Sequence, residues 1–85
     1  MKVSFHGTVL DYTSGVTSLE DNAQDLRELV DLLGERFGAP FKEFLLSDDT
    51  CTFLVNGMGI MNLGGLDTPL GADDEVEMLP FVDGG

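Results

Sequence analysis

The strongest periodic pattern in the chain is that of an amphipathic helix in its first half. Apolar side chains recur there at the spacing of one helix face, at Leu26, Leu29, Val30, Leu33 and Phe37. Asp21 and Asn22 are both suitable N-caps, and Gly38 is a stop signal. The pattern predicts one long helix over about Ala23–Phe37. Gly34 is an unfavourable residue inside a helix, so we expect close packing at that position.

Segments with strand character flank this helix on both sides. They lie at residues 2–9, 16–19, 50–55, 58–61 and 73–81. The first two predict a hairpin, and Asn56-Gly57 is a strong turn signal before the short fourth segment. In the last segment, alternation places Val76 and Met78 on one face and Leu79 on the other.

The remaining segments predict a short helical turn and a loop. Residues 40–46 carry apolar side chains that would tuck under the domain, at Phe41, Phe44 and Leu45. Residues 62–71 contain three glycines and Pro69, which favour a loop. The order of elements predicts an α+β fold, with a mixed four- to five-stranded sheet packed on one long helix. We expect a single domain over residues 1–81 and a flexible tail at 82–85.

The charge balance is strongly acidic. The 85 residues include 16 acidic and 4 basic side chains, and the formal net charge is −12 at pH 7. Nucleic acids and anionic membranes bind clusters of Lys and Arg, so this composition excludes both and favours partners with basic surfaces. A solvated acidic coat that only keeps the protein soluble explains the charge equally well. A signal peptide and an apolar run of the ~20 residues that span a membrane are both lacking, so a cytoplasmic protein is expected.

The predicted domain offers no persuasive catalytic or metal-binding constellation. The chain has one histidine, His6, and one cysteine, Cys51. A cysteine in an apolar strand usually behaves as a small buried hydrophobe. Asp48-Asp49 and Asp73-Asp74-Glu75 provide oxygen ligands without the spacing of a calcium loop, and we expect them to form turns. The sequence therefore predicts no metal site and no internal active site.

The C-terminal third resembles a known family of sulfur carriers. Its last six residues read Pro80-Phe81-Val82-Asp83-Gly84-Gly85. Further matches, in the family's order, are Val55-Asn56-Gly57, Thr68-Pro69-Leu70 and Ala72-Asp73-Asp74-Glu75-Val76. The pattern is similar to that of the molybdopterin synthase small subunit and the related thiamine-type sulfur carriers, which have a ubiquitin-like β-grasp fold. Phe81 stands where the molybdopterin type commonly has a second proline.

This resemblance implies chemistry at the end of the chain. A backbone end that enters a narrow enzyme channel must lack side chains, and Gly84 and Gly85 meet that need. The resemblance implies that the Gly85 carboxylate attacks the α-phosphate of ATP on an E1-like adenylating enzyme and then becomes a thiocarboxylate. The sulfur would pass to a pterin precursor on a large synthase subunit, or to another acceptor enzyme. The chain would thus be a carrier and not an enzyme, without a permanently bound cofactor, since the ATP is used by the activating enzyme.

Two other functions remain open at this point. In one, the chain is a ubiquitin-like modifier whose activated Gly85 is joined to lysines of target proteins. In the other, it is an interaction domain that is never activated. Alternation places apolar side chains outward on neighbouring strands, which is typical of a docking surface. The expected partner-binding residues are Leu54, Leu79, Pro80, Phe81 and Val82.

Overall fold

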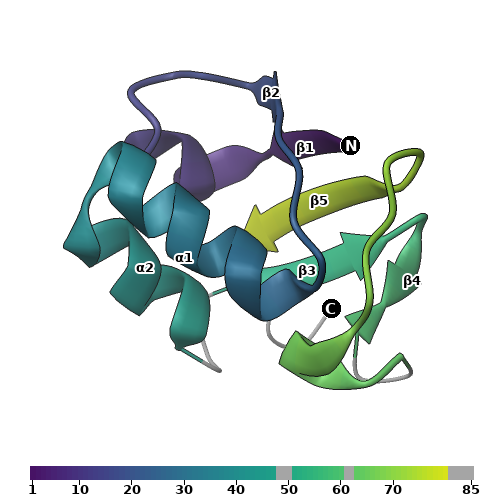
Figure 1. Ribbon diagram of the computed structural model, residues 1–85. Helices are drawn as coiled ribbons and strands as arrows, with labels where there is room; N and C mark the ends of the chain where they lie inside the picture. Colours follow the sequence, from purple (N-terminus) through teal and green to yellow (C-terminus); the bar gives the residue numbers. More distant parts are fainter. Residues whose placement is uncertain (48–50, 61–62, 81–85) are drawn as a thin grey trace.

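The computed structural model describes residues 1–47, 51–60 and 63–80, which form a layer of helices on one face of a sheet (Figure 1). The helices are α1 (Leu26–Phe37) and α2 (Ala39–Leu46), with 3-10 turns η1 (Gly7–Asp11) and η3 (Gly65–Asp67). The strands are β1 (Lys2–Phe5), β2 (Ser18–Glu20), β3 (Cys51–Val55), β4 (Met58–Gly59) and β5 (Glu75–Pro80). Among the described residues, neither helix is long and apolar enough to cross a membrane.

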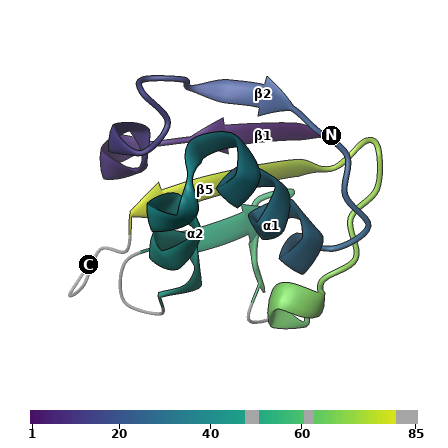
Figure 2. The same ribbon diagram turned by 60° about the vertical axis from the view of Figure 1, so that its left-hand side comes forward.

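The sheet has the strand order β2-β1-β5-β3-β4, so the last strand in the sequence lies at its centre. β1 and β5 are parallel, and the other neighbouring strands are antiparallel. Val3 lies opposite Leu19 of β2 and Val76 of β5, which defines the register of these three strands. Parallel neighbours require a crossover connection, and both helices cover one face of the sheet (Figure 2). The predicted α+β fold with a mixed sheet is confirmed.

The core lies between the sheet and the helices, at the positions that the alternation predicts. Val76 and Met78 of β5 are fully buried, whereas Leu79, the residue after Met78 on the opposite face of the strand, is only half-buried. α1 contributes four buried side chains, Leu26, Leu29, Val30 and Leu33. Because burial of one large apolar side chain is worth about 1.5–3 kcal/mol, this helix face supplies much of the free energy of folding.

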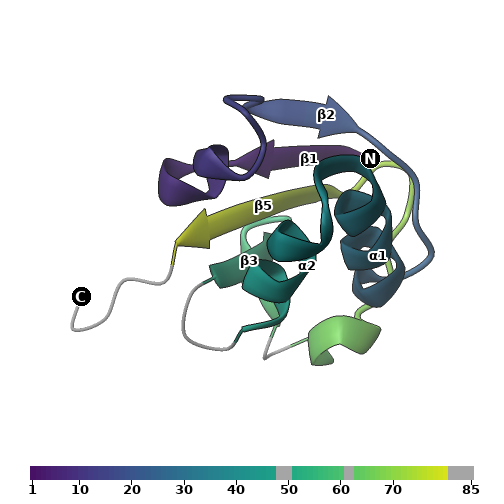
Figure 3. The same ribbon diagram turned by 90° about the vertical axis from the view of Figure 1, so that its left-hand side faces the viewer.

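The first strand is shorter than its sequence pattern predicts. The alternation over residues 2–9 predicts a strand that reaches Val9, whereas β1 ends at Phe5 and the chain turns into η1. Val9 is still fully buried, because this turn brings it back to the core. Gly7 has a φ of +59°, a left-handed conformation that glycine adopts without strain. Figure 3 shows η1 close to the tip of β5.

The long helix begins at Leu26, and its N-cap is Asp25 instead of the predicted Asp21 or Asn22. The Asp25 carboxylate accepts a 2.8 Å hydrogen bond from the backbone N–H of the third helical residue. The residues just before the helix remain extended because they pair with the loop at 68–70, through backbone hydrogen bonds of 3.0 and 3.1 Å. A long-range contact therefore overrides the earlier capping signals.

The segment predicted as a helical turn is a helix of 8 residues, α2. Its Phe41 and Leu45 are buried, and Phe44 is half-buried, as expected. Gly34 of α1 faces this helix, and a Cβ placed on Gly34 would stand 2.9 Å from the Cβ of Lys42. The expected close packing at Gly34 is thereby confirmed, because a side chain there would force the two helices apart.

Hydrogen bonds join the β3–β4 turn to the entry of β5. Asn56 has a φ of +53° and Gly57 one of +83°, as the predicted turn requires. Asn56 Nδ2 donates to Asp74 Oδ1, and the backbone N–H of Glu75 donates to Asn56 Oδ1, each at 3.0 Å. The backbone N–H of Gly71 donates to Asp74 Oδ2 at 2.7 Å. The Asn56 hydrogen bond, and then that of Gly71, lowers the pKa of Asp74 below its ordinary 3.8.

Replacement of Asn56 by alanine is expected to destabilise the domain and to weaken its acid sensitivity. The left-handed backbone alone costs alanine about 1–2 kcal/mol. A carboxyl group whose pKa is lowered by folding stabilises the fold above its ordinary pKa, and this contribution is lost as the pH falls through the lowered value. Urea unfolding at pH 7 and at several pH values below 3.8 should reveal a smaller acid-dependent loss in Asn56→Ala than in the wild type.

Asn56→Gly separates the two effects, because glycine tolerates the left-handed conformation but cannot donate to Asp74. We expect it to lose less stability than Asn56→Ala at pH 7 while showing the same reduced acid sensitivity. An acid dependence equal to that of the wild type in both variants would mean that Asn56 does not set the pKa of Asp74.

Candidate functional site

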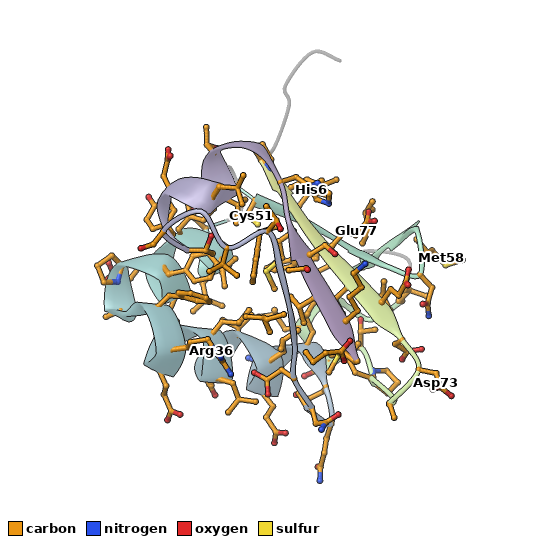
Figure 4. All side chains as sticks on the ribbon, turned by 90° about the horizontal axis from the view of Figure 1, so that it is seen from above. His6, Arg36, Cys51, Met58, Asp73 and Glu77 are labelled. Carbon is orange, nitrogen blue, oxygen red and sulfur yellow. The ribbon has the colours of Figure 1, made fainter. Side chains whose placement is uncertain are left out.

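The predicted partner-binding residues that the structure describes lie near the end of β5. In the antiparallel β3–β5 pair, Leu79 lies opposite Thr52, and Glu77 lies opposite Leu54. These four residues alternate with buried neighbours and are half-buried, so they lie on the sheet face away from the helices. We call them the outer patch. Figure 4 shows Glu77 and His6 on this side of the sheet.

The outer patch combines apolar surface with one carboxylate. Leu54 and Leu79 are diagonal neighbours on adjacent strands, close enough for large side chains to interact. Leu54 lies opposite Gly59 of β4 on its other side, and Gly59 has no side chain to cover it. The outward direction expected for both leucines is found, although they are half-buried rather than fully exposed. Neighbouring apolar side chains on an open sheet face are a suitable docking surface.

Pro80 marks the end of β5 and does not extend the outer patch. It lies opposite Cys51 in β3, is half-buried, and packs against Gly7. Alternation places its ring on the other side of the strand from Leu79. The remaining predicted site residues lie outside the described residues: Phe81, Val82, Gly84 and Gly85.

Basic side chains are few, and carboxylates lie beside them. Three form exposed ion pairs: Arg27 with Asp67 at 3.1 Å, Arg36 with Asp21 at 3.8 Å, and Lys42 with Asp31 at 2.7 Å. On the sheet, Lys2 lies between Glu20 of β2 and Glu75 of β5. Such exposed pairs add little stability. On the sheet face next to the outer patch, Lys2 is thus flanked by two carboxylates, so the charge that this row offers a partner is negative.

Cys51 and His6 point to opposite sides of the sheet. Cys51 is buried, and burial raises the pKa of its thiol from 9.0 to about 12, so the reactive thiolate is scarce at neutral pH. His6 is exposed. Asp74 forms the turn contacts described above, as predicted, whereas Asp48-Asp49 lies outside the described residues. No group of three or more His, Cys, Asp or Glu side chains in the described part of the chain could hold a metal ion.

The sequence pattern did not reveal the role of Gly7. A glycine directly after an alternating segment is typical of an ordinary turn, and the contact with Pro80 joins residues far apart in the chain. The stack of Tyr12 on Phe44, with ring centroids 4.5 Å apart, was missed for the same reason. Both features depend on which segments the fold brings together.

The model of the ThiS family matches residues 3–85, which include Gly84 and Gly85. The chain belongs to the ThiS family. Membership confirms the resemblance to the ubiquitin-like sulfur carriers, and it extends that resemblance over the first half of the chain. No curated protein matches the chain.

Solved structures similar to this ThiS-family chain come from several different organisms. CysO from Mycobacterium tuberculosis, an antigen, has a TM-score of 0.83 and 23% identity, covering 95% of this chain and 98% of its own. The small archaeal modifier protein 1 from Methanosarcina acetivorans has a TM-score of 0.80 and 24% identity, covering 99% and 94%. A complex of subunits 1 and 2 of the molybdopterin-converting factor from Helicobacter pylori has a TM-score of 0.68 and 31% identity, covering 99% and 96%.

These likenesses establish the fold as a ubiquitin-like β-grasp. Family membership also places the chain among the small ubiquitin-like carrier proteins of the ThiS type, and the neighbour at 31% identity was solved as a protein–protein complex. For this ThiS-family chain, partner binding through the outer patch and through the residues after β5 stays a prediction.

Proposed function

We propose that the chain is a sulfur carrier that acts through the carboxylate of Gly85. An E1-like enzyme would bind ATP, and a carboxylate oxygen of Gly85 would attack the α-phosphate, releasing pyrophosphate and leaving an acyl-adenylate. A donor of sulfide-level sulfur (HS⁻) would then attack the acyl carbon, forming the C–S bond while the bond to AMP breaks, and loss of a proton leaves a thiocarboxylate. The observation that carries this proposal is the ThiS family match, which runs through Gly84 and Gly85 on a β-grasp domain.

The sulfur acceptor that we propose belongs to molybdopterin biosynthesis, which makes the molybdenum or tungsten cofactor, or to a related pathway. The likeness at 31% identity to a complex of the molybdopterin-converting factor supports this choice. A large synthase subunit, or another acceptor enzyme, would then receive the thiocarboxylate end. The chain itself would hold no permanent cofactor, and both steps would take place in the cytoplasm.

Docking through the outer patch would bring this end to the partner. Leu54 and Leu79 supply apolar contact, and Glu77 lies opposite Leu54, while Glu20 and Glu75 flank Lys2 further along the same sheet face. A complementary partner surface would therefore be apolar with a basic margin. Electrostatic complementarity of this kind speeds association and selects the partner more than it adds affinity.

Replacement of Leu79 by aspartate should weaken complex formation with an activating or acceptor enzyme by about 30-fold, the loss of roughly 2 kcal/mol expected at an interface hot spot. Val16→Asp is the matched control, because Val16 is 39% exposed and lies outside the outer patch. Titration calorimetry with either enzyme measures the affinity, and thermal unfolding verifies that both variants are folded. Equal affinity of the two variants would exclude the outer patch as the docking surface.

The second candidate function is protein modification, with the activated Gly85 joined to lysines of target proteins. The likeness to a small archaeal modifier protein, and the acidic, lysine-poor composition, favour this alternative. Both functions share the adenylation step. Lysine-linked adducts found by mass spectrometry in cells that express the chain would favour modification over sulfur transfer.

The proposal is tested by incubating the purified chain with an E1-like enzyme, ATP and a sulfur donor, and recording its intact mass. A mass gain equal to the exchange of one oxygen for one sulfur supports the carrier function. Formation of the adenylate without sulfur uptake from any donor would point to the modifier. Neither product with several activating enzymes would leave an interaction domain that is never activated.

A further inference from the structure

The contact between Gly7 and Pro80 distinguishes this glycine from the other described glycines of positive φ. Gly7 lies at the junction of β1 and η1 with a φ of +59°. A Cβ placed on Gly7 would stand 2.8 Å from Cγ and 3.1 Å from Cδ of Pro80. Carbon atoms pack at about 3.5–4.0 Å. Position 7 therefore has no room for a side chain while Pro80 keeps its place.

A change of pucker in the Pro80 ring would move Cγ but would leave the 3.1 Å approach of Cδ, which is bonded to the backbone nitrogen. The ring is part of the main chain and fixes its own φ near −65°. The junction beneath it is also held, because the backbone N–H of His6 donates to the carbonyl of Met78 at 3.0 Å, and Phe5 lies opposite Met78 in the parallel β1–β5 pair. A side chain at position 7 would thus displace either the end of β5 or the junction itself.

The left-handed backbone of Gly7 does not by itself explain the need for glycine at this contact. Gly65 has nearly the same φ, +62°, and Gly15 has a φ of +85°, but a Cβ on either would meet nothing within 4 Å. These two glycines are required only by their turns. Gly7 has a second role, because the ring of Pro80 occupies the volume that a side chain on residue 7 would fill.

We propose that Gly7 is a positioning residue for the end of the chain. By seating the ring of Pro80, Gly7 fixes the position of the end of β5, the point from which the chain continues toward Gly85. This inference rests on the proposed function, in which Gly85 is the activated residue. Five residues span at most about 18 Å, so the position of Pro80 limits the region that the carboxylate of Gly85 can reach.

If a partner binds the outer patch, the position of Pro80 affects the rate of the reaction at Gly85. The partner would bind Leu54 and Leu79, and its active site would lie at a fixed distance from them, where it must receive Gly85. Linked binding of two sites depends on whether the connecting segment can satisfy both at once. Displacement of Pro80 would leave docking intact but would misplace the Gly85 carboxylate relative to ATP. Small misplacements of a reacting group lower the reaction rate strongly.

The test compares Gly7→Ala with Gly65→Ala, which imposes the same backbone conformation without the contact. Both are assayed for adenylation by the activating enzyme, through ATP–pyrophosphate exchange. We expect kcat for Gly7→Ala to fall about tenfold, with KM within about twofold of wild type. Both constants should change less than about twofold for Gly65→Ala. A general loss of stability would lower the melting temperature in both variants but would not separate their kcat values.

A second-site variant tests the contact itself. Pro80→Ala removes the ring, so Gly7→Ala/Pro80→Ala should recover the kcat of Pro80→Ala alone. A nuclear Overhauser effect between Gly7 Hα and Pro80 Hγ protons is expected in the wild type, and its absence would overturn the inference. Equal kcat for Gly7→Ala and Gly65→Ala, or independent losses in the double variant, would overturn it too. A wild-type chain that is not activated at all would instead refute the proposed function.

Discussion

Deletion of Gly85 alone is expected to reduce adenylation by at least about 100-fold while leaving the melting temperature unchanged. The deletion moves the terminal carboxylate back by one residue, or about 3.5 Å, and a misplacement of 1 Å can already cost that factor. The core lies within residues 1–80, so the free energy of unfolding should not change. ATP–pyrophosphate exchange measures the first quantity, and thermal unfolding the second.

The matched control for this deletion is Asp83→Ala, which changes the same segment but retains both glycines. We expect its adenylation rate to stay within a few-fold of wild type. If the chain without Gly85 were activated as fast as the intact chain, the carboxylate of Gly85 would not be the reacting group, and the interaction-domain alternative would gain support. The deletion therefore tests the site of activation independently of the docking surface.

The largest expected effect on stability comes from replacing Phe41 by alanine, at about 3–5 kcal/mol. Phe41 is fully buried in α2, and its ring lies at the centre of an aromatic cluster. Its ring centroid lies 5.6 Å from Phe37, 5.7 Å from Tyr12, 6.0 Å from Phe5 and 6.5 Å from Phe44. The substitution removes contacts with α1, β1 and the segment after η1 at the same time. Urea unfolding monitored by circular dichroism measures the loss.

Phe44→Ala provides the comparison, because Phe44 belongs to the same helix and the same cluster but is only half-buried. We expect it to cost less than half as much free energy as Phe41→Ala, since less apolar area is lost from the core. Equal losses in the two variants would mean that the stack of Tyr12 on Phe44 contributes as much as the buried centre of the cluster. The two variants together show how much of the stabilisation from α2 packing comes from Phe41 and how much from Phe44.

The elements predicted correctly from the sequence are those whose signals are local. The apolar face of α1, the Asn56-Gly57 turn and the alternation of Val76 and Met78 in β5 all follow from spacings of a few residues. Each of these signals agrees with the packing that the rest of the fold imposes. Gly34 could be assigned to a close contact for the same reason, because a glycine inside a strong helix needs a local explanation.

The errors arise where segments distant in the sequence meet. Asp21 and Asn22 are good caps in isolation, but pairing with the loop at 68–70 keeps the chain extended up to Asp25. β1 ends before Val9 because Gly7 turns the chain beneath the end of β5. No periodicity within residues 2–9 contains this information.

For the candidate site, the sequence predicted the directions of Leu54 and Leu79 because side chains alternate along a strand. It did not reveal that Glu77 lies beside Leu54 in the paired strand, since register depends on which residues of β3 and β5 face each other. Nor did it reveal Gly7, which lies 73 residues before Pro80 and contacts it only in the folded domain. The roles of Gly84 and Gly85 rest on the family match.

The central place of β5 in the sheet also determines when the domain can fold during its synthesis. β5 pairs with β1 on one side and β3 on the other, so the sheet stays split until β5 itself has left the ribosome. Pairing of the first and last strands is a contact of high sequence separation, which slows folding. Any chain arrested or cleaved before β5 would lack both the fold and the segment that bears Gly85. An activating enzyme that recognises the assembled sheet would therefore act only on folded molecules that contain β5.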